Sequence, residues 1–345
     1  MTQISLLDGG LGQEINKRSP SDTSHPLWSV KVMDEHPQIV VDVHKDFLNA
    51  GARTLSVNSY TITQSRLKRN GASGRFDEWH ALALATIHQA IHETDIDRND
   101  ITIAGCLPPI AASYVSEAAL DYQESYDEYA SIIEAQQADV DLFLVETMSN
   151  IQETKAAIAA LRDYGHEALI GLTLKDDSSN LLRSGERLEQ AIDILAAEGL
   201  SALCVNCCYP ESIDKAIPLI AKTGIRTGGY ANGFTSISAL APGQTVDNLS
   251  ARTDLSAQEY STYIDKWLDA GATIIGGCCE IGPDHIASLH HHLTRNGYEI
   301  TKLTAYGSST KLPTNSFLEN SSCASAISLS AKVFASKGRM VPASI

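Results

Sequence analysis

The sequence lacks long apolar runs and an excess of positive charge, and each absence excludes a class of function. No apolar run approaches the ~18 residues that a membrane-spanning helix needs. Basic residues number 26 against 42 acidic ones, for a formal net charge of −16. Such a chain has no electrostatic basis for binding nucleic acid or an anionic membrane surface. The start, Met1–Asp8, also lacks the basic and long apolar regions of a signal peptide, so we expect a cytoplasmic protein.

The sequence also lacks a cysteine pattern that suits a disulfide framework, because its seven cysteines are an odd number in clustered spacing. Thiols stay reduced in the cytosol, where cysteines serve metals or catalysis more often than disulfides. Five of them gather where apolar runs end: Cys204, Cys207, Cys208, Cys278 and Cys279.

Short β-branched and aliphatic runs alternate with segments of helical periodicity along the chain, which predicts repeated β-then-α units. The expected strands are Ile4–Leu7, Arg53–Val57, Ile101–Ala104, Leu142–Val145, Ala168–Leu172, Ala202–Val205, Ile225–Gly229 and Thr273–Ile275. The expected helices are Pro37–Ala50, Glu78–Thr94, Tyr122–Ala138, Ile151–Tyr164, Gly185–Ala197, Glu211–Thr223, Ala257–Ala270 and Pro283–Thr294. Eight such units predict an α/β fold, a (β/α)₈ TIM barrel.

We expect a single barrel domain over residues 1–305, followed by a Ser-rich C-terminal tail over residues 306–345. The tail is low in large apolar residues. It is either disordered or forms a helix over Ala324–Lys337 that packs on the barrel or on a partner subunit. Whether the chain forms a homo-oligomer stays open.

Two long segments after expected strands are candidate covers for an active site. The segment Tyr230–Leu255 contains Gly, Pro, Asn and Ser without strong periodicity, and Ser19–Trp28 follows the first strand. Loops that follow barrel strands carry function in this architecture.

The residues with chemical potential all follow expected strands, at the end of a barrel where active sites lie. Because the strands are predicted from hydrophobicity alone, this agreement is an independent check. The residues are Asp8, Asn58, Glu146, Cys207, Cys278 and Cys279.

Cys207, Cys278 and Cys279 predict a zinc site with three thiolate ligands and an open fourth position. Their alternative interpretation is as small buried hydrophobic residues. Adjacent side chains at a strand end cannot both face one core, and Gly276-Gly277 would let the backbone turn so that both sulfurs converge. Cys204 is expected to pack within its strand, and Cys208 to point away from the metal. Cys106 and Cys323 have no evident partners, and we interpret both as structural.

Two acids offer a site for a substrate ammonium group. Glu146 ends an apolar strand, where it is either solvated or holds a cation. Asp8 precedes Gly9-Gly10, which make a tight turn or expose N–H groups to an anion the size of a carboxylate. The spacing does not fit a nucleotide-binding loop. His290–His292 lie on an outer helix and point in three directions, so we do not expect a metal site there.

At these residues the chain resembles the homocysteine S-methyltransferase family over about residues 5 to 293. The most specific matches are Val205-Asn206-Cys207 and Gly276-Gly277-Cys278-Cys279, followed by Gly282-Pro283-Asp284-His285-Ile286. Further matches are Leu7-Asp8-Gly9-Gly10, Pro26-Leu27-Trp28-Ser29, His44, Ala50-Gly51-Ala52, Asn58-Ser59-Tyr60 and Val145-Glu146-Thr147.

The resemblance implies a zinc-containing (β/α)₈ barrel that methylates homocysteine to methionine. It implies that Cys207, Cys278 and Cys279 are the zinc ligands. It assigns the amino-acid end of homocysteine to Asp8, Gly9 and Glu146. We expect Asn58 and Ser59, which follow the second strand, to bind substrate as well. The Trp28-Ser29 pair is more similar to the branch that uses S-methylmethionine than to the branch that uses betaine. Departures at Asn58, Cys106 and Tyr230-Ala231-Asn232 leave the methyl donor open.

The expected reaction moves a methyl group from a sulfonium donor, S-methylmethionine or S-adenosylmethionine, to the homocysteine thiol. We expect Trp28 and Tyr60 to line the donor pocket, because aromatic faces attract a cation without neutralising its charge. One alternative is transfer to another thiol or a selenol, or with betaine as donor. A second is a non-catalytic barrel that senses an amino acid, which a fourth protein ligand such as Cys208 would favour.

Overall fold

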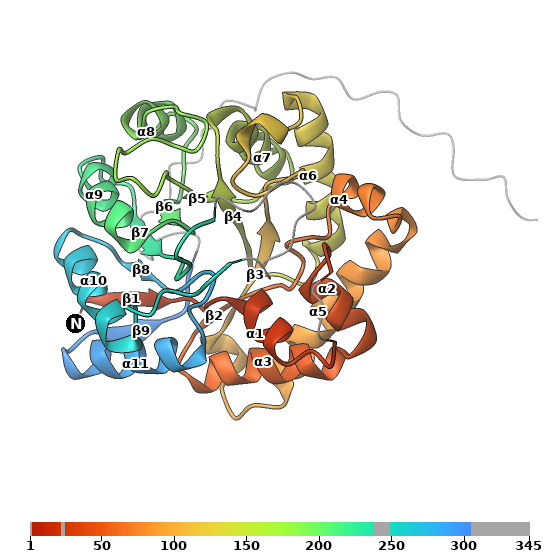
Figure 1. The fold of residues 1–345 in the computed structure, drawn as a ribbon, viewed down its shortest axis with the longest axis horizontal. Coiled ribbons are helices and arrows are strands. Elements are labelled where there is room, and N and C mark those ends of the chain that lie inside the picture. The colour runs from red at the N-terminus through yellow and green to blue at the C-terminus, as the bar shows by residue number, and fades with distance from the viewer. Residues whose placement is uncertain (1, 22–24, 238–248, 305–345) are drawn as a thin grey trace, which may run out of the picture. The chain divides into compact units, whose positions relative to one another are not determined.

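The computed structural model describes residues 2–21, 25–237 and 249–304, and these belong to a compact unit that spans Met1–Tyr306 (Figure 1). The expected tail over 306–345, with its helix over Ala324–Lys337, lies outside the described residues. Within the described residues, no helix has the length and apolarity to cross a membrane.

The fold is α/β, and in the described part of the chain nine strands form one curled parallel sheet in the order β2-β3-β4-β5-β6-β7-β8-β1-β9. The strands are β1 (Gln3–Leu6), β2 (Thr54–Ser56), β3 (Thr102–Leu107), β4 (Leu142–Met148), β5 (Leu169–Leu172), β6 (Ala202–Asn206), β7 (Thr227–Tyr230), β8 (Ile274–Ile275) and β9 (Glu299–Thr301). All eight expected strands are present. The ninth strand is an addition that the sequence pattern did not reveal.

The sheet curls until β1 meets β2. Leu7 pairs with Thr54 in a parallel bridge, and the N–H of Asp8 donates to the Thr54 carbonyl at 3.0 Å. β9 pairs with the other edge of β1, and the residues after it approach the strand starts, where the Thr102 hydroxyl donates to the Leu303 carbonyl at 2.6 Å. The sheet therefore curls as in a TIM-like fold, with Leu303 buried near the strand starts.

Helices surround the sheet, as Figure 1 shows. They are α1 (Leu11–Lys17), α2 (Ser29–Glu35), α3 (Pro37–Asn49), α4 (Gln64–Arg69), α5 (Phe76–His92), α6 (Tyr122–Gln136), α7 (Ile151–Asp163), α8 (Leu188–Ala196), α9 (Pro210–Ala221), α10 (Ala257–Asp269) and α11 (Pro283–Arg295), with 3₁₀ turns η1 (Ser73–Arg75), η2 (Arg98–Asp100) and η3 (Ser116–Ala118). The expected helices are all present. The short helices α1, α2 and α4 were not expected, because each is too brief to show clear periodicity.

The core has two layers. Apolar side chains of the outward strand faces pack under the helices, and a smaller cluster that includes Leu7, Leu144 and Tyr230 fills the interior. Strands buried on both faces show continuous apolar runs, which explains why the sequence pattern located them. Capping boxes begin two of the helices, at Asp121 with Glu124 and at Ser256 with Glu259.

We expect buried His44 to make the stability of the fold depend on pH. Its ring is fully buried in α3, both ring nitrogens lack hydrogen-bond partners, and burial lowers its pKa from 6.5 to about 3. The unfolded chain therefore takes up this proton first, so stability falls as pH drops below about 6.5 and is unaffected above it. In urea unfolding, the parent should lose free energy of unfolding between about pH 7.5 and about pH 5.5. His44→Leu should make that loss smaller by about 1.4 kcal/mol. An equal loss in both proteins would contradict this prediction.

Candidate metal centre

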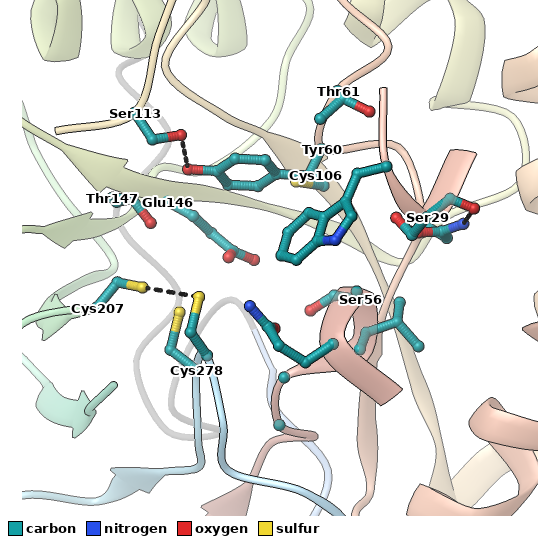
Figure 2. Close-up of a pocket in the computed structure, with 18 of the residues that line it drawn as sticks. Ser29, Ser56, Tyr60, Thr61, Cys106, Ser113, Glu146, Thr147, Cys207 and Cys278 are labelled. Atoms are coloured by element: carbon teal, nitrogen blue, oxygen red, sulfur yellow. Dashed lines mark hydrogen bonds between the residues drawn. The ribbon is translucent and has the colours of Figure 1, made fainter. Parts of the chain in front are cut away.

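A cavity opens where the strands end, and Figure 2 shows side chains from several strands converging on it. Its wall includes residues that follow β1, β2, β6 and β8, the end of β4, and the unexpected helices α1 and α4. His25 and Phe234, from the two segments predicted to cover the site, also line it. Parts of those segments, residues 22–24 and 238–248, lie outside the described residues.

Cys207, Cys278 and Cys279 are brought together in this cavity. Their sulfur atoms all lie within 4.8 Å of one another, and the Cys207 and Cys279 sulfurs are 3.6 Å apart. Two sulfurs on a tetrahedral zinc, each at about 2.3 Å from the ion, lie about 3.8 Å apart. The donor set and spacing therefore fit a metal ion of the zinc type. Within the described part of the chain this is the sole cluster of three such ligands.

The end of β6 is shaped to present Cys207. This residue adopts a left-handed backbone conformation with φ of +50°, which is uncommon for residues other than glycine. Its N–H donates to the Tyr230 carbonyl at 3.0 Å, and its carbonyl accepts from the Asn232 amide at 3.0 Å and the Thr173 hydroxyl at 3.2 Å. Two neighbouring segments, after β5 and at the end of β7, thus hold the turn that positions the sulfur.

Gly276-Gly277 serve close packing and not the backbone turn that the sequence suggested, since neither has a left-handed φ. A Cβ on Gly276 would lie 2.6 Å from the Leu7 side chain, and one on Gly277 would lie 2.2 Å from Ile281. The segment instead takes its course from main-chain bonds, because the Cys278 N–H donates to the Ala231 carbonyl at 2.9 Å.

Gly9 holds the cysteine segment from the β1 side, so we predict that Gly9→Ala weakens metal binding. A Cβ there would lie 2.0 Å from the main-chain oxygen of Ile281, which forces the segment after Cys279 to move. Metal content and thermal unfolding of the variant should both fall. Gly74→Ala is the matched control, because nothing lies within 4 Å of a Cβ at Gly74. Unchanged metal content in Gly9→Ala would show that the segment tolerates the displacement.

The thiols share hydrogen bonds with each other and with Tyr114. The Tyr114 hydroxyl lies 2.9 Å from the Cys207 sulfur and 3.9 Å from that of Cys279. Hydrogen bonds from Cys207 and Cys278 lower the pKa of Cys279, while burial raises the pKa of Cys207. The cluster therefore favours a thiolate at Cys279. Tyr114 was not expected from the sequence, because nothing in its local pattern relates it to a cysteine 93 residues away.

The other described cysteines do not join the cluster. Cys208 is fully buried in the apolar core, where burial raises the pKa of its thiol to about 12. Cys204 packs inside the sheet, as expected. Cys106 differs from the prediction in lining the cavity wall, although it remains buried. Cys323 lies outside the described residues.

Asp8 and Glu146 face the same cavity and are joined through Ser56. The Ser56 N–H donates to an Asp8 carboxyl oxygen at 2.8 Å, and its side chain also hydrogen-bonds to Glu146. Burial raises the pKa of Asp8 to about 7. Burial and the charge of Asp8 raise the pKa of Glu146 to about 8. A bound cation would stabilise the ionised form of both acids.

Glu146 lies inside β4 and not after it, which corrects its predicted position. The register of β4 against β5 shifts between Val145 and Met148, and Thr147 has a left-handed φ of +62°. The Asn206 side chain stabilises this irregularity. Its Oδ1 accepts from the Thr147 N–H, and its Nδ2 donates to the Thr147 hydroxyl, both at 2.9 Å. Asn206 is thus a positioning residue that the sequence pattern did not single out.

The residues after β2 divide between cavity and core. Asn58 lines the cavity wall, where its side-chain oxygen accepts from the Ser29 hydroxyl at 2.7 Å. Ser59 is not among the lining residues, and its hydroxyl instead accepts from Gln136 at 3.3 Å. The chain bends here, since the Ser59 N–H donates to the Val57 carbonyl at 2.7 Å, and a role for Ser59 in substrate binding stays a prediction.

Trp28 and Tyr60, the predicted donor pocket, both line the cavity. The Trp28 ring covers Gly12, where a Cβ would lie 3.1 Å from it, and its indole N–H is buried without a partner. The Tyr60 hydroxyl lies 2.9 Å from that of Ser113, as Figure 2 shows. The binding roles of these residues, and of Asp8, Gly9, Asn58 and Glu146, remain predictions.

Comparisons with known proteins agree in both sequence and fold. A family model described as homocysteine S-methyltransferase matches residues 5–293. The chain is 28% identical to a selenocysteine Se-methyltransferase of Brassica oleracea var. italica, over 84% of this chain and 88% of that protein. It is also 28% identical to a homocysteine S-methyltransferase of Escherichia coli (strain K12), over 83% and 94%.

A solved structure extends the agreement to the fold. The metallated form of the homocysteine methyltransferase MmuM from Escherichia coli matches with a TM-score of 0.70 and 24% identity, over 84% of this chain and 96% of that one. The family model covers most of the chain, including every cavity residue discussed above. The chain therefore belongs to the homocysteine S-methyltransferase family and is a methyltransferase.

Proposed function

We propose that this protein transfers a methyl group from a sulfonium donor to the thiol of L-homocysteine, giving methionine, with zinc as its cofactor. The observation that carries the proposal is the three-cysteine cluster in one cavity with buried Asp8 and half-buried Glu146. We also infer that residues 1–305 act as one (β/α)₈ domain with a separate tail over residues 306–345.

Cys207, Cys278 and Cys279 would hold the zinc, which lowers the pKa of a bound thiol and so makes the acceptor sulfur nucleophilic at neutral pH. Asp8 and Glu146 would bind the acceptor's ammonium group. Both acids are desolvated and both contact Ser56, so a single cation beside them would stabilise the ionised form of each. Three thiolates would keep the net charge of the metal site negative. The acceptor sulfur would therefore retain the electron density that makes it nucleophilic.

In the transfer, a new carbon–sulfur bond forms to the acceptor as the donor's methyl–sulfur bond breaks, and the electron pair of that bond stays on the donor sulfur. The donor thereby becomes a neutral thioether, and the acceptor's thiol proton leaves to water. Trp28 and Tyr60 would hold the sulfonium through their ring faces. An anion at this position would stabilise the charged donor more than the transition state.

One alternative has a specific observation behind it. The similar proteins include a selenocysteine Se-methyltransferase, so a selenol is a second candidate acceptor in the same site. The amino-acid sensor is disfavoured, because Cys208 is not in the cluster and so does not close the metal site.

The test combines metal content and turnover on one reduced, purified sample. Homocysteine and selenocysteine would be offered as acceptors, each with S-methylmethionine, S-adenosylmethionine and betaine in turn. One zinc per chain together with methionine from a sulfonium donor is expected. Zinc without turnover from any donor, or active protein without metal, would refute the proposal.

A further inference from the structure

Two arginines of α4 line the cavity, and the mechanism above uses neither. The Arg66 side chain is only 8% exposed, and it donates to the main-chain oxygens of Pro109 at 2.8 Å and Ile110 at 3.1 Å. Arg69 is exposed and donates to the Ala111 oxygen at 3.0 Å. Both guanidinium groups are therefore fixed on the loop that follows β3.

The acceptors around Arg66 are uncharged. Within the described residues, neither arginine forms a salt bridge. Glu153 attracts Arg66 but accepts from the Ile110 N–H at 2.8 Å, and Glu128 accepts from the Ser65 N–H at 3.1 Å. A buried guanidinium without an ionised partner is costly, so it is usually compensated by a charge. Glu153 supplies part of that charge from within the protein, and an anionic group of a ligand in the cavity would supply more.

The arginines lie next to the predicted donor pocket. The Arg66 guanidinium carbon is 5.5 Å from the centre of the Tyr60 ring, and its Nη2 lies 3.3 Å from the Ser113 hydroxyl. In Figure 2, Ser113 and the hydroxyl of Tyr60 lie on the opposite side of the cavity from Ser56. Arg66 thus lies on the side of the cavity formed by Tyr60 and Ser113.

We propose that Arg66, Arg69 and Ser113 form a binding site for the carboxylate of the methyl donor. The proposal rests on the proposed function, since it assigns further residues to the donor in the same site. A planar guanidinium matches the geometry of a carboxylate. The donor's carboxylate, bound at Arg66, would lie between the positive charge of Arg66 and the sulfonium held by Trp28 and Tyr60.

Arg69→Gln tests the site, because Arg69 is exposed and its replacement should not disturb folding. Three donors are compared with homocysteine as acceptor: S-methylmethionine, its carboxamide, and a sulfonium carboxylate without an amino group. The parent should use both carboxylates at least about 10-fold better than the carboxamide. Arg69→Gln should raise KM for both carboxylates by about 10-fold and leave KM for the carboxamide and for homocysteine unchanged.

Lys68→Gln, an exposed neighbour in α4 that does not line the cavity, is the matched control for lost charge. Arg66→Lys keeps the charge but not the planar geometry, and it should also weaken carboxylate donors selectively. Equal effects of Arg69→Gln on the carboxamide and the carboxylates, or a parent indifferent to the carboxylate, would overturn the site.

Calorimetric binding of S-methylmethionine and its carboxamide separates the two proposals. Carboxylate-dependent binding that needs Arg69, without methionine formation, would support the site while refuting the proposed function. Methionine formation without carboxylate dependence in binding or turnover would refute the site and leave the proposed function standing.

Discussion

Replacing Cys278 by serine is expected to remove bound metal and methyl transfer together while leaving the fold intact. The hydroxyl is a far weaker zinc ligand than a thiolate, and two remaining thiolates do not complete the site. Loss of a residue that only hydrogen-bonds to a metal ligand already lowers activity by up to about 100-fold. Loss of a ligand itself should therefore lower the rate of methyl transfer by more than that. Metal analysis, turnover with homocysteine and circular dichroism measure the three quantities.

The fold should survive because Cys278 lies at the mouth of the barrel and is only partly buried. Thermal unfolding of the variant should therefore match that of the parent after removal of metal by a chelator. Cys208→Ala is the control, since Cys208 belongs to the core and not to the cluster, so that variant should keep its metal. Global unfolding of Cys278→Ser, while the chelated parent stays folded, would contradict the prediction.

Glu146→Gln is expected to weaken acceptor binding by about 30- to 4,000-fold in KM for homocysteine. The substitution preserves shape but removes one of the two charges that face the cavity. Truncating one member of a buried charge pair costs about 2–5 kcal/mol, which corresponds to that range. Because burial raises the pKa of Glu146 to about 8, the parent should also bind the acceptor more tightly as pH rises towards 8, and Glu146→Gln should lose this step.

The matched control for Glu146 is a substrate. An acceptor with a thiol and a carboxylate but no amino group should react equally with the parent and with Glu146→Gln, because it offers no ammonium group. If the variant is impaired with both acceptors, Glu146 acts on the metal cluster or the fold. If it is impaired with neither, Asp8 alone holds the ammonium group.

Local pattern was sufficient for the main sheet and for the position of the cysteines. Strands such as β5 and β6 are buried on both faces, so their sequences are continuous apolar runs that end sharply. Parallel strands place all their C-terminal ends at one side, so residues that follow β6 and β8 had to lie near each other. This is why a three-cysteine cluster could be predicted from segments 70 residues apart.

The same reasoning did not reach features in which direction or packing depends on a distant segment. Ser59 faces Gln136 and not the cavity, although Asn58 beside it lines the wall. The strand β9 has only three residues and one charged side chain, so its pairing with β1 had no visible periodicity.

Apolar periodicity thus predicts the α/β fold and its strand order, and cysteine spacing predicts the metal cluster. Contacts between distant segments decided everything finer: the bond between Asn206 and Thr147 that shapes the end of β4, the approach of Tyr114 to Cys207, and the placing of Arg66 beside Tyr60. The physical reason is range. Periodicity indicates which face of one element is buried. The partner of a side chain depends on how separate elements pack against each other, and the local sequence around a residue does not indicate that packing.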